Sequence, residues 1–456
     1  MVRRLSNWVG VELTHGKHLV AAGLWSVLAR LAGIAATFVV GVVLARLLGP
    51  EALGVYGIVV AVALVLSVIA QAGLPTLATR EIAVALSTEN WPAARGALQG
   101  FAVFVCAASI VLGMLLAIFS IAAPEILGRA STSYGLGSLL VPLFALTVLV
   151  GADLRAFGGL VIGQSLDTLV RPLALIVFCL VAHSIFGAFT SSMAVTFNAA
   201  AALVGLLFGV IALNNRVQPA IRSATPHYNR ASWLRTALPL ALVDWLRQVD
   251  GTYGIILVGV LSSDLDAGYF RLAFSVSVCV GAPLAIFHQV LAPTIAQLMA
   301  ADEMTRLQRL LRNAAFLMTT ILLLEFLVIA FASRPIISAV FGSAYADASL
   351  PLVFLTGAQL VNAIFGASWM MLAMGGGERI LTVSFVISVA TSILAAIALG
   401  LVWGMPGVAA ASVIGAMVQS IISWQYGRSK YGVDGSFLSI LSRANSNPRR
   451  RTECAE

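Results

Sequence analysis

The sequence predicts an all-α, polytopic integral membrane protein with about twelve transmembrane helices in two six-helix lobes. Three observations support this fold class. The 456 residues are 60% hydrophobic and only 10% charged, with a mean hydropathy of +0.98, which is far more apolar than a water-soluble domain. Apolar stretches of about 20 residues, the length that crosses a bilayer, recur from Leu19 to Arg428. Basic residues gather on alternate connections between these stretches.

The twelve stretches fall into two sets of six. The first six expected helices cover residues 20–46, 53–79, 97–122, 137–156, 160–182 and 186–213. The second six cover residues 234–260, 268–297, 313–332, 350–373, 380–402 and 406–427. Short polar breaks separate neighbouring stretches, as expected for helices that cross the membrane in alternate directions.

The basic residues predict the orientation in the membrane. If the amino terminus is cytoplasmic, only Arg46, Arg129 and Arg334 fall on external loops. Four arginines lie within helices, and the rest of the 27 Lys and Arg lie on the cytoplasmic side. This asymmetry predicts that both termini are cytoplasmic. It also indicates that the net charge of +8 reflects membrane topology and contact with lipid headgroups rather than nucleic-acid binding.

The longest polar break divides the chain into two halves. It runs from Asn214 to Arg235 and contains two prolines and four arginines. We therefore expect a cytoplasmic or interfacial amino terminus over 1–18, a first lobe over 19–213, a cytoplasmic linker over 214–233, a second lobe over 234–428 and a basic cytoplasmic tail over 429–456. The segment ending at Tyr56 weakly resembles the one ending at Tyr269, which favours two parallel repeats.

Nothing in the sequence indicates an enzyme. There is no Gly-rich phosphate loop, no nucleophile triad and no large external loop that would hold a catalytic site. The four cysteines are scattered without metal-ligand spacing, and His288 stands alone. We expect no metal and no cofactor, apart from a coupling ion such as H⁺ or Na⁺.

Three arginines lie deep within apolar stretches and are the strongest candidates for substrate binding: Arg30, Arg171 and Arg247. An arginine at the bilayer centre costs roughly 3 kcal/mol on insertion scales, so each needs a watery cavity or a partner. A guanidinium binds two phosphate oxygens at once, which suits an anionic diphosphate substrate. The alternative is an internal ion pair that locks helices together. A fourth arginine, Arg271, is expected to snorkel to the outer surface or to pair with a nearby acid.

Four acids within the apolar stretches have a second possible role: Asp167, Asp244, Asp250 and Glu325. Asp167 lies four residues before Arg171, and two of the others flank Arg247 at three-residue steps, so each set shares a helix face. These acids either exchange ions to drive transport or form ion pairs. Glu325 stands alone in its apolar run and fits a packing role better than a coupling role.

Uncharged polar residues also lie within the expected helices. Six of them are candidate contacts for sugar hydroxyl groups: Gln71, Gln164, Asn198, Gln289, Gln359 and Asn362. Hydrogen bonds between helices are the simpler explanation for any one of them.

The stretch over residues 44–83 resembles the beginning of lipid-linked oligosaccharide flippases, the polysaccharide-transporter (Wzx-type) branch of the multidrug/oligosaccharidyl-lipid/polysaccharide superfamily. The matching residues are Ala45-Arg46, Leu48-Gly49-Pro50, Gly54, Tyr56, Gly73-Leu74 and Arg80. Similar segments follow at Asp250 and at residues 267–277, 291–298, 341–348 and 407–415. The resemblance implies a MATE-like, two-lobed bundle whose central cavity opens alternately to each side of the membrane.

The resemblance also implies a function. Such flippases move undecaprenyl-diphosphate-linked oligosaccharide repeat units from the inner to the outer leaflet of the bacterial inner membrane, for O-antigen, capsule or exopolysaccharide synthesis. Membrane lipid and a polysaccharide polymerase or export machinery are the expected partners. The chain has about twelve spans, so a lipid groove built by two further C-terminal helices, as in lipid II flippases, is not expected. An ion-coupled exporter of multiple drugs or small molecules, and a non-transporting membrane scaffold, remain the alternatives.

Overall fold

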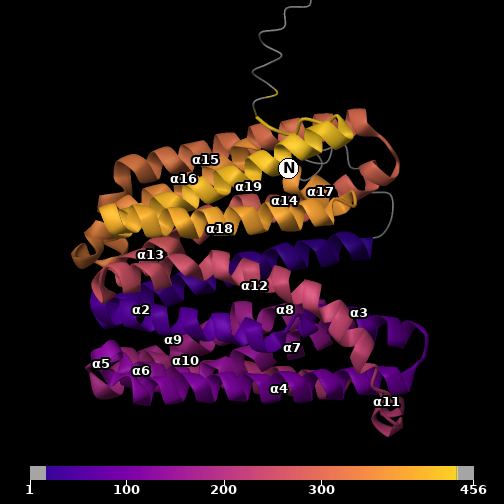
Figure 1. Ribbon diagram of the computed structural model, residues 1–456, viewed down its shortest axis with the longest axis horizontal. Helices are drawn as coiled ribbons and strands as arrows, with labels where there is room; N and C mark the ends of the chain where they lie inside the picture. The colour runs from indigo at the N-terminus through magenta and orange to yellow at the C-terminus, as the bar shows by residue number, and fades with distance from the viewer. Residues whose placement is uncertain (1–16, 438, 440–456) are drawn as a thin grey trace, which may run out of the picture. The chain divides into compact units, whose positions relative to one another are not determined.

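The computed structural model describes residues 17–437 and 439. These residues form helices joined by short connections and contain no β-strand (Figure 1). Ten helices among them are long and apolar enough to cross a membrane. The predicted all-α, polytopic membrane fold is confirmed. The expected segment 1–18 falls almost wholly outside the described residues, and so does the tail beyond Phe437 apart from Ser439.

The described residues form two compact units. The first, called here the N-terminal unit, comprises Trp25–Ser275 and Ile337–Ala348. The second, the C-terminal unit, comprises the described residues of Val276–Ile336 and Ser349–Glu456, with 17–24 from the start of the chain. The boundary between the predicted lobes at the linker 214–233 stays a prediction.

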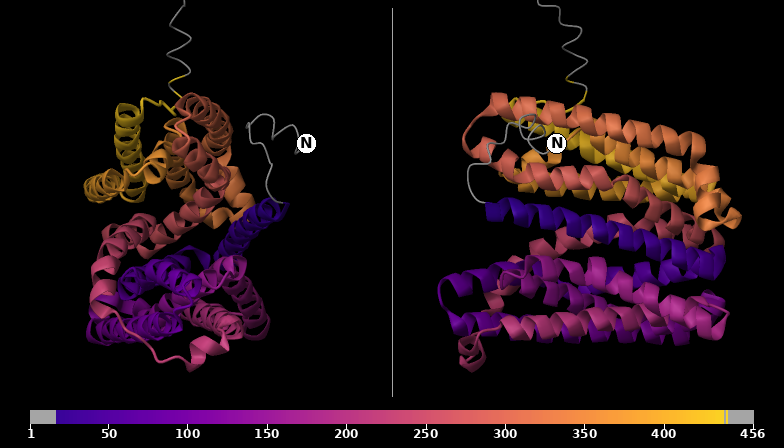
Figure 2. Two further views of the ribbon diagram at one scale, coloured as in Figure 1. Left: turned by 90° about the vertical axis from the view of Figure 1, so that its right-hand side faces the viewer. Right: turned by 180° about the vertical axis from the view of Figure 1, so that it is seen from behind.

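The N-terminal unit contains the first part of the chain up to the eighth expected span. Its helices are α2 (Lys17–Gln71, from Trp25 on), α3 (Leu74–Ser87), α4 (Trp91–Ala122), α5 (Pro124–Leu127), η1 (Gly128–Ala130), α6 (Ser131–Gly137), α7 (Leu140–Ala156), α8 (Leu160–Ser165), η2 (Leu166–Val170), α9 (Arg171–Phe186), α10 (Ser191–Arg216), α11 (Pro219–Ser223), α12 (Arg230–Leu261) and most of α13 (Asp264–Val280). Figure 2 shows the same helices from the side and from behind.

Some expected spans differ from the helices in their bounds. The first two spans are joined in α2, whose backbone departs from helical geometry at Gly49 (φ 75°, ψ 171°), because Pro50 cannot continue the hydrogen-bonding pattern of the preceding turn. The seventh span is α12, which carries Asp244, Arg247 and Asp250 near its middle. The eighth is divided into α13 and α14 (Ala282–Ala300).

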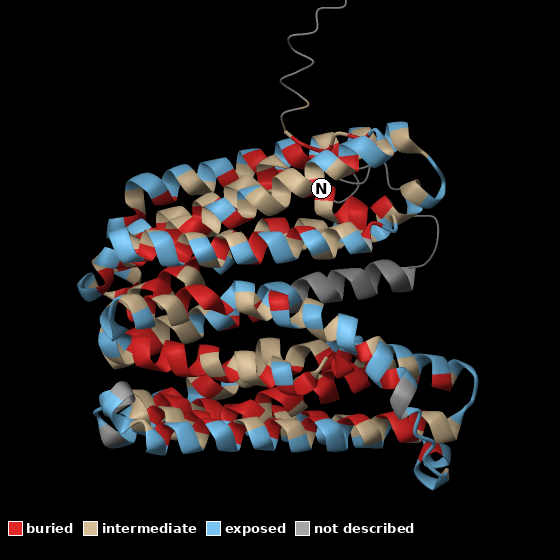
Figure 3. Ribbon diagram, in the orientation of Figure 1, coloured by how far each residue is buried: buried red, intermediate tan, exposed pale blue. Residues whose placement is uncertain are grey.

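Helix α7 occupies the centre of the N-terminal unit. It packs against α3, α4 and α10, and most of its residues are buried, as expected for a helix that is apolar on all sides (Figure 3). Beside it, Leu77 and Ile82 of α3 are fully buried in a cluster with Phe101 and Trp233. The rings of Phe101 and Trp233 meet edge to face, with centroids 4.8 Å apart.

The C-terminal unit contains the remaining helices. These are α14, α15 (Met304–Phe341, up to Ile336), α16 (Ser349–Ile364), α17 (Ser368–Met374), α18 (Glu378–Trp403) and α19 (Met405–Tyr431), while η3 (Ser343–Ala348) belongs to the first unit. Helices α18 and α19 are packed closely through small residues. Ser388 donates a hydrogen bond to the carbonyl oxygen of Gly415 (2.8 Å), and a side chain at Gly415 would overlap Ser392.

Candidate functional site

Arg171 lies at a break in the fifth expected span. Residues 166–170 form a π-helical turn, and α9 begins at Arg171 with Pro172 in its second position. Pro172 has no backbone N–H and its ring crowds the preceding turn, so the helix widens locally instead of continuing as an α-helix. The guanidinium of Arg171 lies 4.0 Å from the carboxylate of Asp167 and 4.6 Å from the ring centre of Phe144.

Tyr56 of α2 lies near Arg171 and also interacts with residues of α10 and α13. Asn198 of α10 donates a hydrogen bond from its amide nitrogen to the Tyr56 hydroxyl at 3.0 Å, and both side chains are buried. Tyr56 is within electrostatic reach of Arg171 and of Arg271 on α13. Tyr56 and Arg271 also line one small cavity of about 40 Å³, which has room for a few water molecules.

We call Arg171, Asp167, Tyr56, Asn198 and Arg271 the inner polar cluster. Arg271 was expected to reach the outer surface or to pair with an acid near it. Instead its side chain packs beside Gly57 and Tyr56 of α2. The nearby acid Asp266 contributes to the start of α13, where its backbone N–H donates to the Ser263 hydroxyl at 3.1 Å and Ser262 donates to its carboxylate.

The cluster continues toward the end of α7. Arg155 interacts electrostatically with Asp167 and with Asp153. Asp153 is only 4% exposed, and its Oδ1 atom has no hydrogen-bond partner among the described residues. The series thus contains three guanidinium groups and two carboxyl groups. With both carboxylates ionised, these five groups together carry one net positive charge, which favours an anion beside them.

Arg30 lies one helical turn from the π-helical segment. A Cβ atom at Gly33 would lie 2.9 Å from Cβ of Thr168, so α2 and η2 are in close contact at this level. Residues three apart share a helix face, which places Arg30 beside that contact. Arg30 is exposed and forms no ion pair within 4.0 Å with any described residue.

Arg247 and its two flanking acids lie on α12. Asp244 accepts a hydrogen bond from the Thr76 hydroxyl of α3 at 3.2 Å and is within electrostatic reach of Arg247. No ion pair within 4.0 Å joins Arg247 to Asp244 or Asp250, and both Arg247 and Asp250 are exposed. In the described part of the chain, Arg247 is therefore not locked in an internal salt bridge.

Four of the candidates belong to the C-terminal unit. Glu325 is half-buried in α15, and its Oε2 atom has no hydrogen-bond partner among the described residues. Asn362 accepts a hydrogen bond from Ser420 of α19 at 3.2 Å, and Gln359 packs against Gly281 at the start of α14. Gln289 is half-buried in α14.

The remaining two candidates belong to the N-terminal unit. Gln71 is buried at the end of α2, and Gln164 is half-buried just before the π-helical turn. The structure thus brings Arg171, Asp167 and Asn198 into one cluster and places Arg30 beside it, while no contact joins Arg247 to them. Among residues 17–437 and 439, no three His, Cys, Asp or Glu side chains form a group that could hold a metal ion.

Some residues of the inner polar cluster, and the neighbouring Arg155 and Asp153, were not among the candidates taken from the sequence. Tyr56 was noted only for its motif, and Arg155 and Asp153 fall so near the end of an expected span that they resemble ordinary interfacial charges. The signal available for Asp153 is a carboxyl group inside an otherwise apolar helix, two residues before an arginine. The sequence predicts that Arg271 lies in a helix. Only the packing of its side chain against Gly57 of α2 shows which way that side chain points.

The polysaccharide biosynthesis protein family model matches residues 19–299, which is more than half of the chain and includes every member of the inner polar cluster. This chain belongs to the polysaccharide biosynthesis protein family. No curated protein sequence matches it.

Solved structures with the same fold cover almost the whole of this family member. An inward-facing multidrug resistance MATE family transporter of the MOP superfamily is 16% identical, with a TM-score of 0.64 over 92% of this chain and 100% of that one. The lipid II flippase MurJ, in an inward closed conformation, is 14% identical, with a TM-score of 0.67 over 88% of this chain and 87% of that one. A MATE transporter of Vibrio cholerae, VcmN, is 15% identical, with a TM-score of 0.59 over 91% and 96%.

The family and the fold together confirm the resemblance seen in the sequence. This polysaccharide biosynthesis protein is a multi-pass membrane protein with a MATE-like fold. The roles of its individual site residues stay predictions.

Proposed function

We propose that this protein flips undecaprenyl-diphosphate-linked oligosaccharide repeat units from the inner to the outer leaflet of the bacterial inner membrane. The repeat units then serve polysaccharide synthesis as O-antigen, capsule or exopolysaccharide. The protein works by alternating access, with both termini in the cytoplasm. A polymerase or export complex receives the flipped units.

The observation that carries the proposal is the basic interior of the N-terminal unit in a member of this family. Arg171 and Arg271 approach one buried tyrosine, and Asp167 lies at the long distance of 4.0 Å from Arg171. A diphosphate supplies the negative charge that this arrangement lacks, and guanidinium groups bind its oxygens in pairs. Arg30 and Arg247 are exposed and form no ion pair with the described residues, so each guanidinium is available to an anionic substrate.

The acids and amides take supporting roles in this proposal. Asp167, Asp244 and Asp250 are the main candidates for coupling transport to H⁺ or Na⁺, and Glu325, the fourth candidate, fits a packing role better. The sugar hydroxyl groups meet the amides of Gln71, Gln164, Asn198, Gln289, Gln359 and Asn362. Asn198 and Asn362 already form hydrogen bonds between helices, so their amides have fewer groups left for a sugar.

An ion-coupled exporter of small molecules is the competing function, because several MATE structures have the same fold. A binding site for organic cations needs acids without excess arginine. The inner polar cluster has the opposite balance, which favours the anionic lipid-linked substrate.

The decisive experiment is a deletion strain with re-expression as control. Lipids are extracted, and the polyprenyl-diphosphate-linked oligosaccharide is quantified together with the surface polysaccharide. We expect the polymer to be lost while lipid-linked repeat units accumulate in the inner leaflet. Unchanged polymer and lipid pools, in a strain without a redundant flippase, would reject the flippase and favour the exporter.

A further inference from the structure

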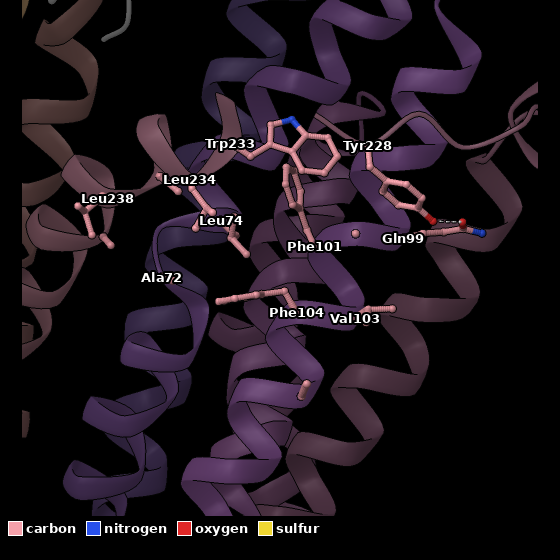
Figure 4. A pocket seen from close by; sticks show the side chains of 14 residues that line it. Ala72, Leu74, Gln99, Phe101, Val103, Phe104, Tyr228, Trp233, Leu234 and Leu238 are labelled. Atoms are coloured by element: carbon pink, nitrogen blue, oxygen red, sulfur yellow. Dashed lines mark hydrogen bonds between the residues drawn. The ribbon is translucent and has the colours of Figure 1, made fainter. Parts of the chain in front are cut away.

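A groove of about 570 Å³ lies in the N-terminal unit between the start of α3, the first half of α4 and the start of α12. Its lining is almost entirely apolar and includes Phe101, Phe104, Trp233 and Leu238 (Figure 4). Its volume falls within the range of about 300–1,000 Å³ that is usual for ligand pockets. The groove is separate from the inner polar cluster, because the two share no residue.

The depth of the groove in the membrane follows from the helix ends. Gln99 and Leu238 each lie eight residues after the first residue of their helices, which is about 12 Å at 1.5 Å per residue. Helix α12 starts in the polar linker, and the start of α4 contacts the linker through the His227–Pro92 hydrogen bond, so both starts lie on the side predicted to be cytoplasmic. The groove therefore lies where the headgroups meet the hydrocarbon core, which is about 30 Å thick. Val103 and Leu238 are 69% and 75% exposed, so the groove is open to the surrounding lipid.

One end of the groove is polar, and basic residues lie close to it in the sequence. There the Tyr228 hydroxyl donates to the side-chain oxygen of Gln99 at 3.3 Å, whereas Leu238 lies at the other end (Figure 4). Arg95 lies one turn before Gln99 on the same helix face and donates to the carbonyl oxygen of Ala224. The polar break over residues 214–235 contains four arginines and no acid, and Arg235 directly follows the groove residue Leu234.

The geometry points to one occupant: we propose that this groove holds the isoprenoid chain of the lipid-linked diphosphate substrate as it waits in the cytoplasmic leaflet. An apolar trough whose polar end adjoins a basic stretch of the chain without acids, residues 214–235, matches an amphiphile that has a single long hydrocarbon chain and a strongly anionic diphosphate. The linker is held at this end, because the N–H of His227 donates to the carbonyl oxygen of Pro92 at 2.9 Å. This inference rests on the proposed function, for which it supplies a docking site apart from the inner polar cluster.

The groove can be blocked without disturbing the helix that forms it. Ala107 is exposed on α4 and lines the groove, so Ala107→Trp fills the trough from its rim. Ala102 is also exposed on α4 but does not line the groove, and Ala102→Trp is therefore the matched control. Each variant is first checked for a wild-type elution profile in size-exclusion chromatography.

The test uses a photoreactive p-benzoylphenylalanine at Leu238 in the full chain, purified in nanodiscs of phosphatidylethanolamine and phosphatidylglycerol with undecaprenyl diphosphate added. We expect undecaprenyl diphosphate adducts at Leu238 about tenfold above its mole fraction among the lipids, a preference of about 1.4 kcal/mol. The same probe at Leu115, which is 56% exposed on α4 but outside the groove, should label lipids in proportion to their amounts. Ala107→Trp should remove the enrichment, and Ala102→Trp should leave it.

Labelling at Leu238 that follows mole fractions would overturn the proposal, because the groove would then hold bulk phospholipid. Equal enrichment in the Ala107→Trp and Ala102→Trp proteins would overturn it as well. The two proposals fail separately. If re-expression restores polymer in the deletion strain but Leu238 shows no enrichment, only the groove is rejected. If Leu238 is enriched while deletion leaves polymer and lipid pools unchanged, only flipping is rejected.

Discussion

Gly54 and Gly268 pack against each other's helices in a reciprocal way. A Cβ atom at Gly54 would overlap the carbonyl oxygen of Asp264, four residues before Gly268. A Cβ atom at Gly268 would overlap the carbonyl oxygen of Pro50, four residues before Gly54. Neither glycine has a positive φ, so close approach of the two backbones is the reason for glycine at both positions. The reciprocity relates α2 and α13 by a local two-fold arrangement.

Replacing Gly54 with valine should therefore destabilise the protein. The side chain would meet backbone atoms, which cannot move aside as a flexible side chain can, and overpacking of this kind costs about 1–3 kcal/mol. We expect a lower melting temperature in detergent, measured by the loss of the monodisperse peak after heating. Gly251→Ala is the matched control, because nothing lies within 4 Å of the Cβ position at Gly251. Equal melting temperatures for the Gly54→Val and Gly251→Ala proteins would contradict the close contact.

The sequence indicated part of this relationship. The segments ending at Tyr56 and Tyr269 resemble each other, and they are the segments that the structure brings together. The sequence alignment, however, sets Gly54 opposite Ala267, whereas the contacts pair it with Gly268. Periodicity identifies which residues are helical, but the one-residue difference in register depends on the packing of two backbones, which no local pattern encodes.

The same limit applies to the candidate site. Arginines inside apolar stretches are visible in a sequence, because they are costly in a membrane and therefore rare. Whether a deep arginine meets an acid, an aromatic ring or a cavity depends on neighbouring helices. For Arg171 the sequence leaves open substrate binding and an ion pair with Asp167 on the same face of a regular helix. The structure places both at a π-helical turn and adds Phe144 from α7 as a contact of Arg171.

A double substitution separates the two possible roles of Arg171. If Arg171 binds the diphosphate, Arg171→Leu should reduce polysaccharide export at least about tenfold, and adding Asp167→Asn should not restore it. If the pair only locks the turn, removing both charges should restore export, because no unpaired buried charge is left. Surface polymer is measured at matched amounts of membrane-inserted protein. Recovery of export in the double variant would remove Arg171 from the binding site.

Arg30→Ala should impair export while the protein still inserts into the membrane. Arg30 has no ion pair within 4.0 Å among the described residues, so its removal leaves no orphaned acid and little cost in stability. The control is Arg334→Ala, which removes an exposed arginine on the predicted external side. Surface polymer is quantified against the amount of protein in the membrane fraction. Normal export by the Arg30→Ala protein at matched expression would exclude Arg30 from substrate binding.

Glu325→Gln should leave export unchanged. The Oε2 atom of Glu325 has no hydrogen-bond partner among the described residues, and an uncharged amide of nearly the same shape fits the same place in α15. Glu325→Lys is the contrasting variant, because it introduces a long cation at the same depth and should reduce the amount of inserted protein. Export is measured in cells, and transport is measured in vesicles with and without a proton gradient. Loss of gradient-driven transport in the Glu325→Gln protein alone would reveal a coupling role instead.

Asp434→Ala should destabilise the C-terminal unit. The carboxylate of Asp434 accepts hydrogen bonds from the Trp424 indole N–H at 2.8 Å, from the Ser436 N–H at 3.0 Å and from the Ser436 hydroxyl at 2.6 Å. Hydrogen bonds to a charged group contribute about 1.5–3 kcal/mol each, and these three share one acceptor group, so we expect a loss of about 2–3 kcal/mol and a lower melting temperature. Glu303→Ala is the matched control, because it removes a carboxylate whose ion pair with Arg306 at 2.8 Å is exposed and should change stability by less than about 1 kcal/mol. Equal melting temperatures for the two variants would mean that Asp434 does not hold the segment after α19 in place.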